Sequence, residues 1–138
     1  MICLVDTSVV LKWFHEEGES DVAPARRLLT AHRGGDARVL LLDLAVYELG
    51  NVLVRALRQP AAVVTQQLDL LHRLCGPFLH PAPSWHARAA QTAETYRLSY
   101  YDASWAAAAE ALDCPLVSAD RRLLAVGAIS AVDAAARL

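Results

Sequence analysis

Short apolar runs alternate with longer segments of mixed polarity along the whole chain. A short, continuous apolar run is typical of a strand that is buried on both faces of a sheet. Runs of this kind predict buried strands at residues 2–5, 38–42 and 115–117, a short strand at 78–80 and an edge strand at 128–132.

The segments between these runs carry a helical pattern. In residues 44–58, apolar side chains recur at positions 46, 49, 53 and 57, on one face of a helix, and Pro60 ends the pattern. Thr7 or Ser8 is a candidate N-cap for a helix that follows the first strand, and Ser84 for a later one. The other helices are expected at residues 8–14, 24–35, 61–74, 84–98 and 99–112.

Strands that alternate with helices in this way pair in parallel through right-handed crossovers. The expected fold class is therefore α/β, a three-layer α/β/α sandwich with a central, mainly parallel sheet. The 138 residues contain no internal repeat or linker and suit one domain over residues 1–138. In such sheets, ligands bind beyond the carboxyl ends of the strands, so the polar residues at that edge are the first candidates for chemistry.

Four acidic residues stand at positions where their side chains would lie together at this edge of the sheet. Asp6 directly follows the first strand, and Asp120 follows the strand at 115–117. Glu48 and Asp102 lie in the first turns of helices that begin at the same edge. Taken singly, each acid has an ordinary explanation, as a helix cap, as a partner of a helix dipole or as a solvated side chain. Their joint placement favours a functional site.

Four carboxylates brought close together repel one another, and without compensation some of them take up protons. A divalent cation removes this cost, and hard oxygen ligands suit Mg²⁺, with Mn²⁺ as an alternative. One ion activates water and stabilises a phosphoryl oxygen, and two ions clamp both the attacking and the leaving oxygen. The cluster therefore indicates phosphodiester cleavage, with one or two ions equally compatible with the sequence.

Composition and motifs argue against several other classes of protein. The net charge of −2 gives no overall basic field for nucleic acid, although a bound metal can supply positive charge locally. Lys12 is the only lysine and stands on the first helix, which argues against a phosphoaspartate enzyme or a receiver module, because that chemistry needs a lysine near the nucleophile. No glycine-rich dinucleotide or P-loop motif occurs. Three cysteines without a C-x-x-C indicate neither a disulfide framework nor a zinc ribbon.

Three segments together resemble a known family. The segments "CLVDTSVVLKW", "LAVYELGNVLVRAL" and "YYDASWAAAAEALDCPLVSAD", in this order and spacing, resemble the PIN-domain ribonucleases, and among them the VapC-type toxin halves of VapBC toxin–antitoxin pairs. The likeness covers essentially the whole chain. It implies a magnesium-dependent endoribonuclease, a hydrolase of RNA, in which the family's acidic residues correspond to Asp6, Glu48, Asp102 and Asp120.

The resemblance also extends to residues around the acids and to partners. Ser8 matches a hydroxyl residue near the first acid, and Ser118 stands where threonine is common. Asn51 lies one helical turn past Glu48, either beside the site or on the helix surface. The family further implies a homodimer and a small antitoxin that blocks the site and binds DNA. No basic leader or bilayer-spanning apolar run occurs, so we expect a cytoplasmic protein.

Several alternatives remain open at this stage. The chain could be an inactive PIN-like module that only binds a partner, or another carboxylate and magnesium phosphoryl-transfer domain. Asp43 is either an N-cap or an extra acid at the rim of the site. Trp13 and Phe14, followed by three polar residues, belong either to the core or to a groove for an antitoxin segment.

Overall fold

A parallel sheet lies at the centre of the computed structural model, which describes residues 1–138. Its strands are β1 (Ile2–Val5), β2 (Arg38–Leu40) and β3 (Leu116–Val117), in the order β2-β1-β3. β1 pairs in parallel with both neighbours, so that Leu4 lies opposite Leu40 and Leu116. The strands are short and mostly apolar, as the sequence predicts, and the last three residues of β1 are fully buried.

Eight α-helices surround this sheet. Chain folding places a helix between successive strands, as parallel pairing requires. The helices are α1 (Thr7–Phe14), α2 (Val22–Gly34), α3 (Leu44–Asn51), α4 (Ala61–Cys75), α5 (Pro83–Tyr96), α6 (Tyr100–Ala111), α7 (Arg121–Leu124) and α8 (Ala131–Ala136), and α3 continues into a π-helical turn, η1 (Val52–Ala56). None of these helices combines the length and the apolar character needed to cross a lipid bilayer.

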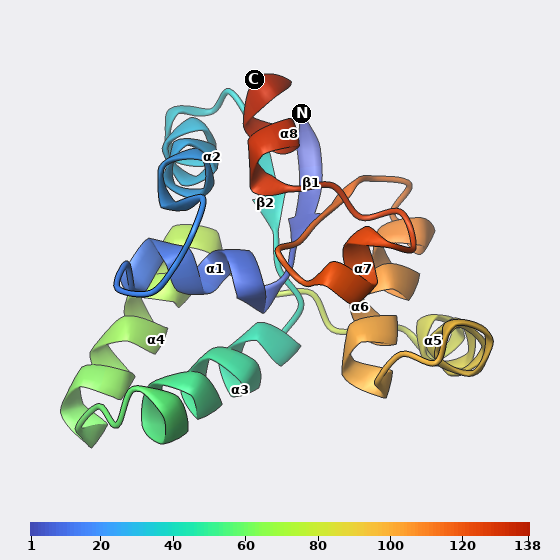
Figure 1. The fold of residues 1–138 in the computed structure, drawn as a ribbon, viewed down its shortest axis with the longest axis horizontal. Helices are drawn as coiled ribbons and strands as arrows, with labels where there is room; N and C mark the ends of the chain where they lie inside the picture. Colours follow the sequence, from blue (N-terminus) through green and yellow to red (C-terminus); the bar gives the residue numbers. More distant parts are fainter.

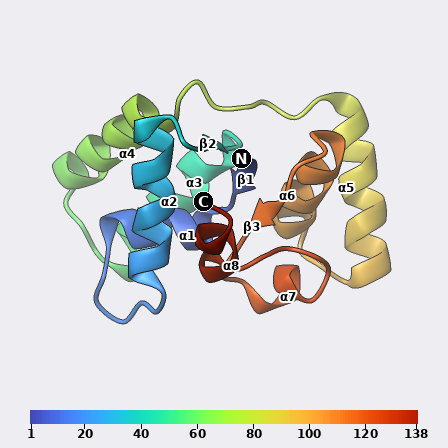
Figure 2. The same ribbon diagram turned by 90° about the horizontal axis from the view of Figure 1, so that it is seen from above.

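The helices form two layers (Figure 1). α6 packs against β1 and β3 on one side of the sheet, and α5 packs on the outside of α6. On the other side α2 packs against β2, and α1 lies between α2 and α3. The view from above shows α5 and α6 together at one end of the molecule and α1, α2 and α4 at the other (Figure 2). The expected three-layer α/β/α sandwich is therefore confirmed.

β2 and β3 are slightly shorter than the predicted runs at 38–42 and 115–117, and two other predicted strands are reduced to single bridges. The run at 78–80 contributes a single parallel bridge, between Leu79 and Leu42. The run at 128–132 likewise pairs only at Ile129, with Val117. Ser130 ends this pairing because its hydroxyl accepts a hydrogen bond from the Asp133 N–H and starts α8.

Two predicted helix caps are wrong. The N-cap of α1 is Asp6, not Thr7 or Ser8, because the Asp6 carboxylate accepts the Ser8 N–H at 3.1 Å. The N-cap of α5 is Ala82, not Ser84, because Pro83 occupies the first helical position, where its missing N–H costs nothing.

Trp13 is a core residue. It is 9% exposed, and its indole N–H donates to the carbonyl of Ala25 in α2 at 2.9 Å. Phe14 is half-buried and packs against the same core. The interpretation of Trp13 as part of the lining of an antitoxin groove is therefore wrong.

The neighbouring Lys12 is also buried, at 4% exposure. Its ammonium group donates to the Glu19 carboxylate at 3.0 Å and to the Ser20 carbonyl at 2.7 Å. These bonds fix the loop between α1 and α2 and keep the only lysine away from the carboxyl edge of the sheet. The three cysteines are free thiols.

Candidate active site

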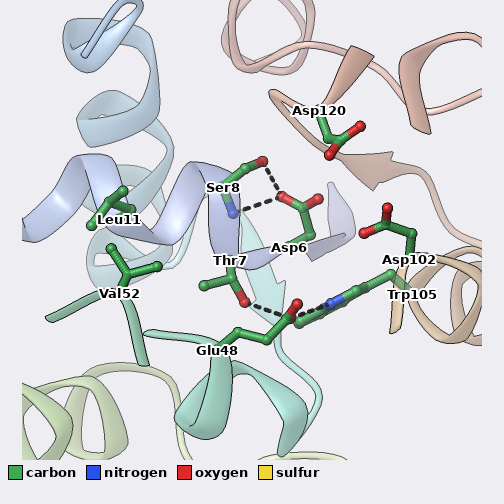
Figure 3. Close-up of a pocket in the computed structure, with 9 residues that line it drawn as sticks. All are labelled: Asp6, Thr7, Ser8, Leu11, Glu48, Val52, Asp102, Trp105 and Asp120. Atoms are coloured by element: carbon green, nitrogen blue, oxygen red, sulfur yellow. Dashed lines mark hydrogen bonds between the residues drawn. The ribbon is translucent and has the colours of Figure 1, made fainter. Parts of the chain in front are cut away.

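A cavity of about 300 Å³ opens at the carboxyl edge of the sheet, between α1, α3, α6 and α7 (Figure 3). The four acids predicted from the sequence all line it, although they come from four different elements. The remaining lining is two hydroxyl residues, two aliphatic residues and one tryptophan. The full lining is Asp6, Thr7, Ser8, Leu11, Glu48, Val52, Asp102, Trp105 and Asp120.

Asp6 forms the floor of this cavity. Its backbone N–H completes the pairing of β1 by donating to the Val117 carbonyl, and its side chain is only 4% exposed. One carboxylate oxygen accepts the Ser8 hydroxyl at 2.5 Å, and the other accepts the Ser118 hydroxyl at 2.6 Å. Donors on both oxygens fix the orientation of the carboxylate. Both serines were predicted to lie near the site, and both contact Asp6 directly.

Glu48 is held by two residues whose roles the sequence did not indicate. Its Oε1 accepts the Thr7 hydroxyl at 2.9 Å and the indole N–H of Trp105 at 2.8 Å. Figure 3 shows the Glu48 head group between these two donors. Trp105 lies three residues after Asp102 on α6, and this spacing, which puts two side chains on one helix face, was the available signal.

Asp102 and Asp120 are half-buried and complete the rim. Asp102 lies in the first turn of α6, where its backbone N–H donates to the hydroxyl of the N-cap Ser99. Asp120 is the N-cap of α7 and accepts the Arg122 N–H at 2.8 Å. The carboxylates of Asp6, Asp102 and Asp120 face a common space (Figure 3).

Burial is the main cause that raises the pKa values of three of the acids, and repulsion between the acids adds to it. Burial raises the pKa of Asp6 to about 6, and the charge of Glu48 adds to this, against the opposing hydrogen bonds from two serines. Burial also raises the pKa of Glu48, with a contribution from the charge of Asp102. The pKa of Asp102 is raised by burial and then by the charge of Asp120. No lysine, arginine or histidine lines the cavity, but the charge of nearby Arg122 lowers the pKa of Asp102 against these effects.

This donor set suits a hard divalent cation in both kind and charge. Carboxylate oxygens are the preferred protein ligands of Mg²⁺ and Mn²⁺, and a cation would offset the buried negative charge and the repulsion that together raise the pKa values. In the arrangement described, however, no three acidic, histidine or cysteine side chains are positioned to hold one ion. Binding of a shared ion therefore requires rotation of these side chains.

Two other candidate residues lie outside the acid cavity. Asn51 is exposed and lines an adjoining cavity, which it shares with Glu48. Asp43 does not cap α3 through its side chain; it pairs instead with His80, Oδ2 to Nδ1 at 2.7 Å.

Solved structures with the same fold come from several organisms. PAE2754 from Pyrobaculum aerophilum is 26% identical, with a TM-score of 0.75 over 99% of this chain and 88% of that one. VapBC-1 from nontypeable Haemophilus influenzae is 16% identical, with a TM-score of 0.65, and FitAcB from Neisseria gonorrhoeae is 21% identical, with a TM-score of 0.60. Each of these two matches covers 94% of this chain and 96% of the other. A comparison with curated proteins gave no match.

The family model described as PIN domain matches residues 3–129. This range includes all three strands and all four acids of the cavity. PIN domains are generally nucleases that typically use divalent metals, which agrees with the donor set found here. Because the match spans most of the sequence, and because the fold agrees with the resemblance predicted from the sequence, the chain belongs to the PIN domain family.

Proposed function

We propose that this protein is a magnesium-dependent endoribonuclease and the toxin component of a type II toxin–antitoxin system. The observation that carries the proposal is the convergence of four mutually repelling carboxylates in one cavity that contains no basic residue. Such a cavity disfavours a phosphate group unless a cation is present. Mn²⁺ is the alternative cation.

In this proposal Asp6, Glu48, Asp102 and Asp120 hold the cation. When bound, the ion offsets the carboxylate charge, orients the phosphodiester and activates water for its hydrolysis. Asp6 and Glu48 supply ligands whose positions are set in advance by hydroxyl and indole donors. Asp102 and Asp120 complete the set of metal ligands after their side chains rotate. Ser8 and Ser118 act through Asp6, by fixing the direction of its two oxygens.

The toxin assignment is supported by the likeness of the motifs to VapC-type proteins and by the shared fold with VapBC-1 and FitAcB. On this assignment the partner is a small antitoxin protein, which places a basic side chain among the acids in the position that the metal's charge would otherwise occupy. We also propose that the toxin is a homodimer.

The test is cleavage of RNA by the purified protein with and without Mg²⁺, with the cut ends mapped on total RNA. We expect internal cuts that require Mg²⁺ and stop when a chelator is added. Asp6→Asn should nearly abolish cutting, because it removes a charge at the floor of the cavity while keeping the side chain's shape.

The matched control is Asp69→Asn, which makes the same chemical change at an exposed acid on α4, away from the cavity. It should cut like the parent. Full activity of Asp6→Asn at unchanged Mg²⁺ would contradict the proposed site. Folded parent protein that cuts no RNA, but still binds the product of the adjacent reading frame, would favour a partner-binding module.

A further inference from the structure

The hydrogen bonds around Glu48 use only one of its two carboxylate oxygens. The Thr7 hydroxyl and the Trp105 indole N–H both donate to Oε1, at 2.9 and 2.8 Å, and Oε2 accepts no hydrogen bond from the protein. Each oxygen of an ionised carboxylate has about two acceptor sites. Oε1 is therefore fully occupied, and Oε2 is the oxygen of Glu48 that remains available.

The two donors reach Glu48 from different elements. Thr7 is the first residue of α1 and Trp105 lies in α6, whereas Glu48 belongs to α3, and Figure 3 shows the Glu48 head group between them. Trp105 is 1% exposed and Thr7 is 7% exposed. A buried donor that loses its acceptor finds little water to replace it, which costs free energy. Use of Oε1 as a metal ligand is therefore unfavourable.

Asp6 shows a similar division between its oxygens. Its Oδ1 accepts both the N–H and the hydroxyl of Ser8, at 3.1 and 2.5 Å, whereas Oδ2 accepts only the Ser118 hydroxyl, at 2.6 Å. The Ser8 oxygen itself accepts the Ala119 N–H at 2.8 Å. The Ser118 oxygen likewise accepts the Asp120 N–H at 3.0 Å, which leaves the hydrogen of each hydroxyl for Asp6. Asp6 therefore keeps one free acceptor site, on Oδ2.

A carboxylate with one free oxygen can bind a cation end-on but cannot chelate it. Mg²⁺ is small, demands near-octahedral geometry and usually keeps several waters beside one or two carboxylates. Ca²⁺ takes more oxygen ligands and often binds both oxygens of one carboxylate. Occupation of carboxylate oxygens by donors within the protein therefore removes ligands that Ca²⁺ needs more than Mg²⁺ does.

We propose that Thr7 and Trp105 are positioning residues that favour Mg²⁺ over Ca²⁺, by keeping Glu48 a ligand through a single oxygen. The inference rests on the proposed function, and it adds the residues that set the choice of cation. Thr7 and Trp105 act through Oε1 of Glu48 and not as metal ligands. Ser8 acts in the same way on Oδ1 of Asp6.

The test is calorimetric titration of Mg²⁺ and, separately, of Ca²⁺ into the metal-free protein, with the ratio of the two dissociation constants as the readout. Thr7→Val removes the hydroxyl and keeps the shape of the side chain, and Trp105→Phe removes the indole N–H and keeps an aromatic ring. We expect each to weaken Mg²⁺ binding by about 10- to 100-fold, the usual effect of losing a group that orients a ligand. Ca²⁺ binding should weaken much less, because the freed oxygen becomes an additional ligand.

Three matched variants separate this effect from general structural damage. Thr7→Ser keeps the hydroxyl and should keep the parental ratio. Thr92→Val makes the same change at a buried threonine of α5, outside the cavity. Trp13→Phe removes a buried indole N–H whose acceptor is a carbonyl of the core. The last two variants should bind both ions like the parent, and circular dichroism melting checks that every variant is folded.

Equal losses of affinity for both ions in Thr7→Val and Trp105→Phe would overturn the inference, because they would indicate a general structural role. A change of the ratio in Thr92→Val or Trp13→Phe as large as in these variants would also overturn it. If Trp105→Phe does not fold, Thr7→Val decides alone. A folded parent that binds neither ion would contradict the proposed function itself, which is distinct from an unchanged ratio in variants of a parent that binds Mg²⁺.

Discussion

The four acids of the cavity fall into two pairs that the protein treats differently. Asp6 and Glu48, the held pair, each accept two hydrogen bonds from neighbouring side chains. Asp102 and Asp120, the open pair, are half-buried, and Asp120 accepts its bond from a backbone N–H. The same type of side chain is thus held by side-chain donors in two places and is partly solvated in two others.

This difference indicates how a site with strong internal repulsion can form in the absence of metal. Donors around the held pair stabilise negative charge in a buried position, where burial alone would favour protonation. The open pair lowers its repulsion by remaining partly in water, and α6 and α7 keep it within reach. We therefore expect loss of a held acid or of its donors to have larger effects than loss of an open one.

The largest effect that we expect concerns pH and the stability of the metal-free protein. The pKa of Asp6 is raised from 3.8 to about 6 by burial. Between these values the folded protein holds a proton that the unfolded chain has lost, so the free energy of unfolding falls as pH rises. The full loss should be about 2–3 kcal/mol, present above pH 6 and absent below pH 4.

Urea unfolding in the presence of a chelator, at several pH values, measures this loss. Asp6→Asn should remove most of it, and Asp69→Asn should leave it unchanged. The distinction between the held and the open pair fails if Asp120→Asn reduces the pH dependence of the free energy of unfolding as much as Asp6→Asn does.

The next effect concerns the donors around the acids. Ser118→Ala removes the hydroxyl on one oxygen of Asp6 and should lower Mg²⁺ affinity by about 10- to 100-fold, the usual effect of losing a group that orients a metal ligand. Titration calorimetry measures it. Ser99→Ala, beside the open acid Asp102, should cost less affinity, and Ser84→Ala, at an exposed serine outside the cavity, should cost none. Equal losses at Ser118 and Ser99 would remove the distinction between the pairs.

The smallest effect concerns the open pair itself. Asp102→Asn removes its repulsion with Asp120 and should raise the stability of the metal-free protein by less than about 1 kcal/mol, because water screens half-exposed charges. Thermal melting with and without Mg²⁺ measures this, and Mg²⁺ should stabilise the parent by mass action. A lower melting temperature for the variant, together with a parent melting temperature that Mg²⁺ does not change, would mean that the carboxylates are not close enough to repel one another.

The sequence predicts the backbone placement of the acids better than it predicts their contacts. Asp6 and Asp120 follow apolar runs, and strand ends in a parallel sheet share one edge, so their gathering follows from periodicity. The bonds from Thr7 and Trp105 to Glu48 depend on how α1, α3 and α6 pack against one another, which periodicity along one helix does not encode.

Asn51 illustrates the limit of reasoning from helical spacing alone. Residues one turn apart lie on the same side of a helix, but they are displaced along its axis by about 4.5 Å at three residues' separation. That displacement puts Asn51 in the adjoining cavity, while Glu48 lines both cavities. The edge strand expected at 128–132 shows a different limit, because one serine cap there outweighs the strand propensity of its apolar neighbours.

Because Lys12 is buried, the chemical reactivity of its amine measures how often the loop between α1 and α2 opens. It is the only side-chain amine in the chain, and both of its bonds are to the loop between α1 and α2. A reagent specific for amines therefore meets no exposed lysine on the folded molecule, and the side chain reacts only when this loop detaches. Any covalent mark that is attached through a lysine amine has to wait for the same event, so the rate of marking follows how often this loop opens.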